Sequence, residues 1–239
     1  MHRRLLWLSV VLNIVLSISI FGFVTKLGGV NYLLFKLQSK DDSTGLSVGR
    51  AGHLSILDGK KATGEIVFVG DSLTEMVQWS EALGNPRIIN RGVGGDNTGR
   101  ILDRIESIAS NKPIKLFIMA GINDLVVDTP AVAFGRYERI IKTVKRLSPD
   151  TRIYIESTIP VNNSVRETKR RNNDVSAIND MLMRLANPDE KIEWIDVRPA
   201  LVDGQGNLNS AFTFDGLHLN GDGIKRWMEV VQPKVIEEI

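Results

Sequence analysis

Five short apolar runs, separated by segments of helical length, constrain the fold of this chain more than any other feature. Each run has the length of a strand and is rich in β-branched residues. Most are almost continuously apolar, which is typical of strands buried on both faces of a sheet. Strand–helix alternation predicts βαβ units and an α/β fold with a mostly parallel sheet and helices on both faces. The expected strands are 66–70, 87–90, 115–121, 152–158 and 191–197, and the expected helices are 73–83, 98–109, 130–147, 168–186 and 222–237.

A serine follows the first predicted strand, in the segment 70–73, which reads Gly-Asp-Ser-Leu. At a strand-to-helix turn, the hydroxyl of Ser72 would project from the carboxyl edge of the sheet, where ligand sites lie in open α/β folds. The first N–H groups of the helix would lie beside it and could stabilise an anion. The alternative is that Asp71 or Ser72 simply caps the helix, which is common.

Segments with glycine and polar residues also follow the second and third predicted strands. Segment 90–96 holds three glycines, which let the backbone approach a ligand closely. It begins like a dinucleotide-binding fingerprint, but Asn97 stands where the next glycine is required and the acidic ribose partner is not evident. After the third strand, the amide of Asn123 could donate a hydrogen bond to a developing oxyanion, or could form an ordinary Asx turn.

The segment 215–220, before the last predicted helix, contains Asp215 and His218. A neutral imidazole at position 218 could take the proton of a serine, and Asp215 could hold the other ring N–H and so fix the tautomer. His53 lies in a predicted linker. A lone histidine is usually structural, but His218 and the segments above all fall at one edge of the predicted sheet. This convergence favours the chemistry of a serine hydrolase.

A metal site is the main chemical alternative. Five side chains could collect near one another and bind Mg²⁺ or Mn²⁺, namely Asp71, Asp96, Asp124, Asp215 and His218. No His-x-His or His-Glu-x-x-His spacing exists, however, and the aspartates have other uses. Asp71 and Asp124 can accept backbone N–H bonds, and Asp96 can cap a helix. We therefore expect neither a metal nor another cofactor.

Composition adds two exclusions. The chain has no cysteine, which rules out disulfides and thiolate chemistry. The formal net charge is +2, which argues against a large electrostatic surface for nucleic acid.

The N-terminal segment 5–24 is apolar and carries no charge. At about 1.5 Å per residue it would span roughly 30 Å, the thickness of a hydrocarbon core. His2, Arg3 and Arg4 precede it, which predicts a cytoplasmic N-terminus and places the rest of the chain on the far side of a membrane. A cleaved signal peptide is the alternative, but the sequence offers no Ala-x-Ala cleavage site. We predict a transmembrane anchor over 1–24, a linker over 25–61 and a hydrolase domain over 62–239.

Four segments, in this order, resemble the motif blocks of the SGNH, or GDSL-type, hydrolases. They are 70–73, the loop 92–96, the segment 121–124 (Gly-Ile-Asn-Asp) and the pair Asp215 and His218. The likeness runs from Glu65 to the C-terminus. Within the family, the segments look most like those of the catalytic subunits of platelet-activating-factor acetylhydrolase. The third block differs, because those subunits resemble Gly-Thr-Asn-Asn where this chain reads Gly-Ile-Asn-Asp.

The resemblance implies a three-layer α/β/α sandwich with a five-stranded, mostly parallel sheet and the activity of a serine esterase. It implies that Ser72 is the nucleophile, His218 the base and Asp215 the orienting acid. It also implies an oxyanion hole made by the N–H groups of Ser72 and Gly95 and by the side chain of Asn123. The related subunits form dimers, so a homodimer stays open for this chain.

The substrate is less constrained than the reaction. We expect a short acyl group, such as acetyl, on a lipid or a carbohydrate, because the predicted anchor would place the domain beside such envelope substrates. A basic run follows the fourth predicted strand and includes Arg166, Lys169, Arg170 and Arg171. We interpret it as a solvated helix start, with the alternative that it overhangs the site and favours anionic groups. A metal-dependent phosphodiesterase and a non-catalytic binding module on the same fold are the alternative functions.

Overall fold

The computed structural model describes residues 7, 13, 16, 17, 19 and 65–238. The chain divides into two units, Met1–Ser55 and Ile56–Ile239, and nearly all described residues belong to the second. The predicted linker and most of the predicted anchor lie outside the described residues. Among the residues that are described, no helix combines the length and the apolar character that crossing a bilayer requires.

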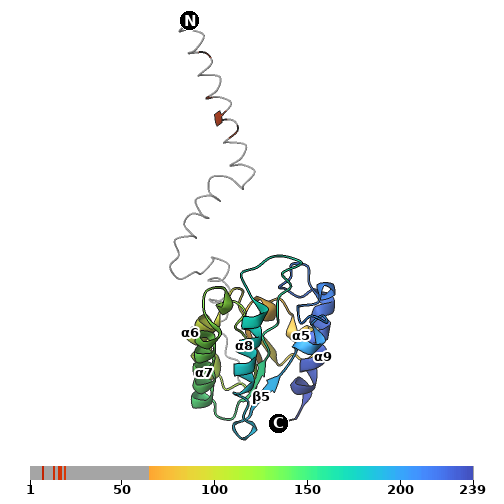
Figure 1. Cartoon of the computed structure of the whole chain (residues 1–239). Coiled ribbons are helices and arrows are strands. Elements are labelled where there is room, and N and C mark those ends of the chain that lie inside the picture. The colour runs from red at the N-terminus through yellow and green to blue at the C-terminus, as the bar shows by residue number, and fades with distance from the viewer. Residues whose placement is uncertain (1–6, 8–12, 14–15, 18, 20–64, 239) are drawn as a thin grey trace. The chain divides into compact units, whose positions relative to one another are not determined.

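One five-stranded parallel sheet organises the described domain, with the strand order β2-β1-β3-β4-β5 (Figure 1). The register places Phe68 of β1 opposite Phe117 of β3, and Phe117 opposite Tyr154 of β4. The predicted parallel α/β fold is therefore confirmed. The strands are β1 (Ile66–Gly70), β2 (Ile88–Gly92), β3 (Lys115–Met119), β4 (Arg152–Glu156) and β5 (Ile192–Ile195).

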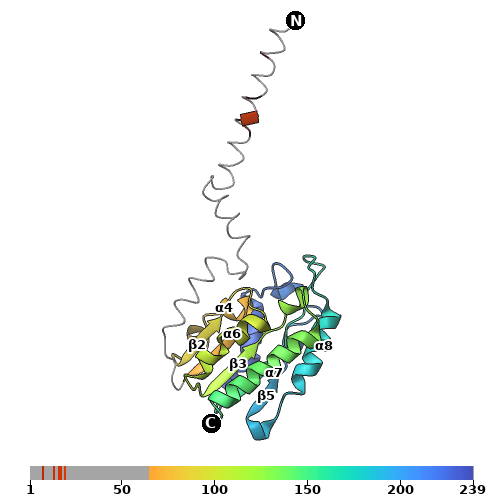
Figure 2. The same ribbon diagram turned by 90° about the vertical axis from the view of Figure 1, so that its left-hand side faces the viewer.

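Helices cover both faces of the sheet, so that the domain has three layers (Figures 1 and 2). Successive residues of a strand point to opposite faces, and Val67 and Val69 therefore enter one core while Ile66 and Phe68 enter the other. The first core is closed by α6 (Thr98–Ala109), α7 (Pro130–Leu147) and α8 (Asn172–Met183), and the second by α4 (Ser72–Glu75), α5 (Trp79–Ala82) and α9 (Gly221–Ile236). Short 3₁₀ turns are η1 (Asp124–Val126), η2 (Pro188–Glu190), η3 (Arg198–Ala200) and η4 (Ser210–Phe212).

Aromatic rings line the second core. The ring of Phe68 stacks between Trp79 and Phe117, at centroid distances of 4.1 and 4.5 Å. Phe117 in turn stacks on Tyr154 at 4.5 Å, and Trp79 meets Trp227 of α9 edge-on at 4.7 Å. Offset stacking and edge-on packing are the favoured arrangements of such rings. The stack ties α5 and α9 to the three neighbouring strands β1, β3 and β4, and β1 is the strand that leads to Ser72.

The single helix predicted over 73–83 is wrong, because the chain forms α4 and α5 with a break at 76–78. The side chain of Asn90, in β2, causes the break. Its Nδ2 donates to the backbone oxygens of Thr74, Glu75 and Val77, at 2.9, 3.2 and 2.9 Å. These carbonyl groups would otherwise accept from the next turn of a continuing helix. The helix that begins at Ser72 therefore ends after one turn.

The helix predicted over 168–186 is also too long, since α8 begins at Asn172. Upstream of it, the N–H and the hydroxyl of Thr168 both donate to Oδ1 of Asn163, at 3.0 and 2.9 Å. A side chain thus takes the donors that would start a longer helix, and residues 163–171 form a loop. The basic run is therefore not a helix start, which corrects the interpretation made from the sequence.

A buried glutamate ends β4. Glu156 is 1% exposed, and its Oε2 accepts a hydrogen bond from Nε1 of Trp227 at 2.5 Å. Burial raises the pKa of Glu156 to about 8, although the hydrogen bond from Trp227 opposes the shift. The carboxyl group therefore keeps its proton at neutral pH.

We expect the free energy of unfolding to fall as the pH rises from about 4.5 to about 8. In this window the folded state keeps a proton on Glu156 that the unfolded state has lost, so each rise in pH favours unfolding. Glu156→Gln should make the slope shallower, because the amide stays neutral and can still accept from Trp227. The difference should be on the order of 4 kcal/mol between pH 5 and 8, measured by urea denaturation. Part of the slope should remain in the variant, because burial also raises the pKa of Asp71, to about 7. Equal slopes in the two proteins would contradict this expectation.

Candidate active site

Ser72 and His218 meet at the carboxyl edge of the sheet. Ser72 opens α4 directly after β1, and His218 lies in the loop before α9. The serine Oγ lies 3.0 Å from Nε2 of the histidine, although the two residues are 146 positions apart in the chain. The structure therefore brings together the predicted nucleophile and the predicted base.

Asp215 holds the opposite side of the imidazole ring. Its Oδ2 lies 2.7 Å from Nδ1 of His218, and its Oδ1 accepts the backbone N–H groups of Leu217 and His218 at 3.0 and 2.8 Å. Burial opposes ionisation, but the hydrogen bonds from His218 and the backbone lower the pKa of Asp215 to about 2. The group is therefore a carboxylate at neutral pH and accepts from Nδ1. Nε2 is then free to accept the proton of Ser72.

The two backbone donors predicted for the oxyanion hole are the N–H groups of Ser72 and Gly95. Gly95 has a φ of +76°, in the left-handed region that strains any residue with a Cβ. The end of β2, which leads to Gly95, packs closely on α4, because a Cβ on Gly92 would lie 2.3 Å from the backbone nitrogen of Glu75. Between residues 65 and 238, neither the Ser72 N–H nor the Gly95 N–H makes a hydrogen bond. Both are therefore available to a ligand.

The side-chain amide of Asn123 is held from two sides. Its Nδ2 donates to the backbone oxygen of Asp96 at 2.9 Å, and its Oδ1 accepts from Nη2 of Arg170 at 2.7 Å. Arginine can only donate and a carbonyl can only accept, so these contacts fix which end of the amide is the nitrogen. The second hydrogen on Nδ2 is left for a ligand. Arg170 also donates from Nε to the oxygen of Ile122, at 3.0 Å.

Arg170 is the site residue that the sequence did not single out. It stood there only as one member of a basic run, and no motif marks it. Its contact with Asn123 spans 47 residues, so no local spacing could have revealed it.

The nearby aspartates have mostly structural partners. Asp71 accepts the N–H of Leu73 at 2.9 Å, and Asp124 accepts the N–H of Thr98 at 2.9 Å, as expected from the sequence. The expectation that Asp96 caps a helix is wrong. Asn97 caps α6, and Asp96 instead pairs with Nε of Arg104 at 2.9 Å. These contacts fix the two loops that present Gly95 and Asn123.

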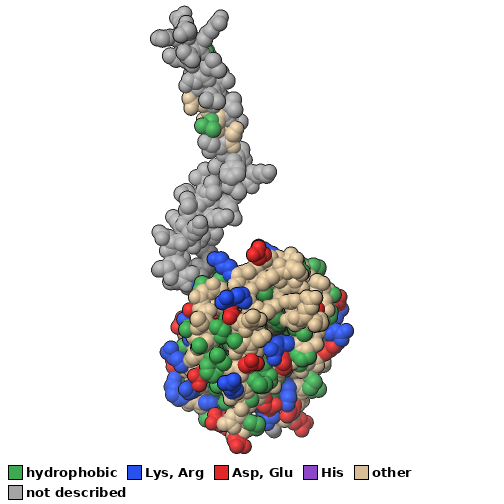
Figure 3. Space-filling model, viewed as in Figure 1, with side chains coloured by type: hydrophobic (Ala, Val, Ile, Leu, Met, Phe, Trp, Pro, Cys, Tyr) green, Lys and Arg blue, Asp and Glu red, His purple; other side chains and the backbone are tan. Residues whose placement is uncertain are grey.

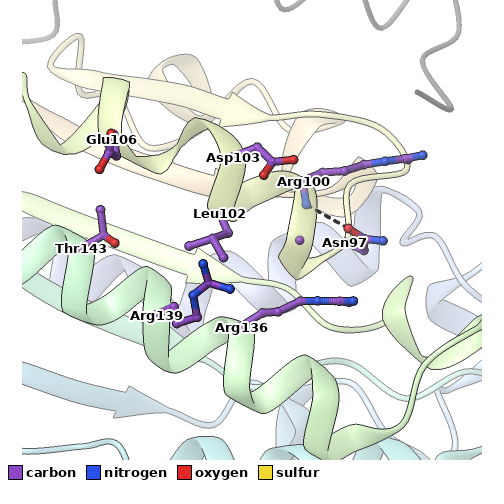
Figure 4. A pocket seen from close by; sticks show the side chains of 9 residues that line it. Asn97, Arg100, Leu102, Asp103, Glu106, Arg136, Arg139 and Thr143 are labelled. Atoms are coloured by element: carbon purple, nitrogen blue, oxygen red, sulfur yellow. Dashed lines mark hydrogen bonds between the residues drawn. The ribbon is translucent and has the colours of Figure 1, made fainter. Parts of the chain in front are cut away.

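A pocket of about 370 Å³ opens beside His218. Asp215, Leu217 and His218 form one part of its wall, and Val126 and residues 166–170 form the rest. The basic run thus borders the site, as the alternative reading of the sequence had it. A second pocket of about 610 Å³ lies between α6 and α7 and is shown in Figure 4. Its wall includes Arg100, Asp103 and Arg136, but none of the site residues predicted from the sequence.

A serine, a histidine and a carboxylate joined at the carboxyl edge of a parallel α/β sheet form the arrangement found in serine ester hydrolases. Residues 68–226 match the model of the GDSL-like lipase/acylhydrolase family, and the chain belongs to that family. Its class of activity is therefore that of a carboxylic ester hydrolase.

Known proteins agree with this assignment. The platelet-activating factor acetylhydrolase IB subunit alpha2 of Rattus norvegicus is 27% identical over 175 residues, which cover 70% of this chain and 74% of the rat protein. A solved GDSL-like lipase of Bacteroides thetaiotaomicron has a TM-score of 0.64 and 22% identity, with 78% of this chain and 95% of the lipase covered. An acetyl-xylooligosaccharide esterase of Geobacillus has a TM-score of 0.60 and 16% identity, with coverages of 75% and 98%. The resemblance stated from the sequence is confirmed, and the two structures share the fold.

Proposed function

We propose that this protein is a serine esterase that removes a short acyl group, such as acetyl, from an ester of a lipid or a carbohydrate. The observation that carries the proposal is the contact of 3.0 Å between Ser72 Oγ and His218 Nε2, with the Asp215 carboxylate 2.7 Å behind the ring. The acetyl group is suggested by the acetylhydrolase name of the curated relative.

The reaction has two halves. Nε2 of His218 removes the proton of Ser72 as Oγ attacks the ester carbonyl, and the resulting oxyanion accepts from the N–H groups of Ser72 and Gly95 and from Nδ2 of Asn123. The intermediate then expels the alcohol, which takes the proton from His218 and leaves an acyl-enzyme. Water, which gives a proton to the same histidine, then attacks the acyl-enzyme. The carboxylic acid leaves, and His218 returns the proton to Oγ of Ser72.

The membrane anchor remains part of the proposal. Segment 5–24 is long enough and apolar enough to cross a bilayer, and the basic residues before it favour a cytoplasmic N-terminus. The hydrolase domain would then work on the extracytoplasmic side. We expect the full chain to stay with the membrane pellet after extraction with alkaline carbonate, and its release into the supernatant would contradict the anchor.

The experiment that tests the activity combines an assay with a covalent label. The full chain in detergent should hydrolyse p-nitrophenyl acetate, and a serine-directed fluorophosphonate should abolish the activity in proportion to labelling. Mass spectrometry should find the label on Ser72, and EDTA should have no effect. Activity that survives complete labelling of Ser72 would refute the nucleophile. Activity lost to EDTA but not to the phosphonate would favour a metal-dependent hydrolase.

Asn123→Ala should lower kcat by roughly 100- to 1000-fold and change KM little, because Asn123 would donate to charge that develops only in the transition state. Steady-state kinetics measure both constants, and a matched thermal unfolding curve controls for folding. A change in KM alone would argue against an oxyanion role.

The hydrogen bond from Arg170 to Asn123 predicts that Arg170 supports turnover through Asn123. Arg170→Met should lower kcat about tenfold, because the amide of Asn123 loses the donor that orients it. In the Asn123→Ala background the same change should cost far less, since nothing remains to orient. Equal losses in the two backgrounds would mean that Arg170 acts independently of Asn123.

A further inference from the structure

The pocket beside His218 lies where the alcohol part of the ester must be. In the proposed reaction, His218 returns its proton to the leaving alkoxide, so the alcohol oxygen has to come within hydrogen-bonding reach of Nε2. The carbonyl oxygen points instead to the donors on Ser72, Gly95 and Asn123. A pocket whose wall contains Asp215 and His218 therefore holds groups attached to the alcohol.

Cationic side chains line this pocket from one loop. Arg166, Lys169 and Arg170 all belong to its wall, together with the carboxylate of Glu167. Arg170 is half-buried, and its guanidinium group already donates to Oδ1 of Asn123 and to the backbone oxygen of Ile122. Arg166 and Lys169 are exposed, and within the described part of the chain neither side chain makes an ion pair or a hydrogen bond. Two uncommitted positive charges thus border the alcohol side of the site.

The loop that carries these cations is held against the catalytic segment. The N–H of Asn162 donates to the backbone oxygen of Gly216 at 2.7 Å, next to the triad carboxylate. Oδ1 of Asn163 accepts twice from Thr168 and closes the loop on itself. At its far end, Arg170 bonds to the backbone oxygen of Ile122, in the segment that follows β3. The positive charges are therefore presented from a backbone braced at both ends.

We propose that the pocket selects esters whose alcohol part carries an anionic group, a phosphate or a carboxylate, and that Arg166 and Lys169 contact that group. The inference rests on the proposed function, because His218 must be the base that faces the alcohol. A pocket of about 370 Å³ is at the small end of ligand sites, which suits one small charged group beside the ester. Val126 and Leu217 supply the apolar part of its wall.

The selectivity has a local origin. On the face of the domain drawn in Figure 3, cationic and anionic side chains are interspersed. A cleft with an excess of one sign concentrates the field and attracts the opposite charge even where the surrounding surface is mixed. Such an attraction between exposed groups weakens with salt, because the screening length shrinks from about 10 Å at 0.1 M to about 3 Å at 1 M.

A matched set of acetyl esters tests the proposal on the full chain in detergent. The esters are 4-acetoxybenzoate and 4-acetoxyphenyl phosphate, with methyl 4-acetoxybenzoate as the neutral reference. Each kcat/KM is divided by the rate of hydroxide-catalysed hydrolysis, which removes differences in intrinsic reactivity. We expect a normalised preference for the anionic esters of about tenfold at low salt, which shrinks toward unity at 1 M NaCl. The two anionic arms tell a phosphate preference from a carboxylate preference.

The double variant Arg166→Gln/Lys169→Gln should lower the anionic-to-neutral ratio by about tenfold. Arg171→Gln is the matched control, because Arg171 lies in the same loop but pairs with Asp174 at 2.9 Å and does not line the pocket. It should leave the ratio unchanged. Circular dichroism of all variants monitors folding, and the ratio itself is insensitive to the fraction of active protein.

Two results would overturn the proposal and are distinguishable. If the wild-type protein hydrolyses the neutral ester with no preference for the anionic ones, or if the preference survives in the double variant, the proposal fails and the proposed esterase function stands. If none of the esters is hydrolysed and the phosphonate leaves Ser72 unlabelled, the esterase function fails and the selectivity fails with it.

Discussion

Ser72→Ala is expected to lower kcat by about 10⁶-fold, the size of loss that removal of the serine causes in a serine protease. The hydroxyl lies 3.0 Å from Nε2 of His218, and within the proposed reaction nothing else can form the acyl-enzyme. Residual catalysis would come only from the oxyanion donors acting on a direct attack by water. KM should change little, since the hydroxyl contributes little to substrate binding before attack.

The measurement needs a matched serine-to-alanine variant outside the site. Ser107→Ala provides it, because Ser107 is an exposed serine of α6 and, within residues 65–238, its hydroxyl bonds only to the backbone oxygen of Arg104. This variant, prepared in parallel, should keep the wild-type rate. The fluorophosphonate should label Ser107→Ala and not Ser72→Ala. A Ser72→Ala protein that retains a tenth of the wild-type activity would remove Ser72 from the mechanism.

Asp215→Asn is expected to lower kcat by about 10⁴-fold, the loss that the equivalent change produces in a serine protease. The reason can be read from the hydrogen bonds of Asp215. Its Oδ1 accepts two backbone N–H groups, from Leu217 and His218, and an asparagine would keep its oxygen there. The NH₂ group would then face Nδ1 of His218 and donate to it. This forces the proton onto Nε2, which can no longer accept from Ser72.

Nitrogen NMR of the imidazole should report the change of tautomer directly, alongside the loss of turnover. Asp222→Asn is a suitable control, because Asp222 is an exposed acid at the start of α9 that pairs with Lys225 at 3.2 Å. It should leave both the tautomer and the rate unchanged. A loss below tenfold in Asp215→Asn, with the protein folded, would mean that Asp215 does not orient the histidine.

Most of the fold could be predicted from the sequence because each strand is a compact apolar run and three of the long helices, α6, α7 and α9, begin at a side-chain cap. The helix predicted over 130–147 matches α7, which opens with the Thr129 cap and a proline. The break between α4 and α5 could not be predicted in this way. It depends on the side chain of Asn90, 16 residues from the carbonyl of Thr74 that it binds.

The candidate site shows the same division. Ser72, Gly95, Asn123, Asp215 and His218 stand in recognisable segments at strand ends, and the structure places Ser72, Asp215 and His218 in contact. The other hydrogen-bond partners of those residues could not be predicted from the sequence. Arg170 reaches Asn123 across a loop whose path depends on contacts far apart in the chain. Its charge therefore suggested a solvated helix start or a contact with anionic groups, and not a bond to Asn123. The predicted membrane segment stays a prediction, because it lies largely outside the described residues.

The one-turn length of α4 has a consequence for how the enzyme can vary. A helix that stops so soon has few aligned peptide groups, so its end offers little of the partial positive charge that long helices provide. In the proposed reaction, the oxyanion would then be stabilised by single donors that follow three different strands, β1, β2 and β3. Mutations that shift these strands relative to one another should therefore be tolerated poorly. A slip of β2 by one residue along β1 should displace the proposed Gly95 donor and leave the contact between Ser72 and His218 in place.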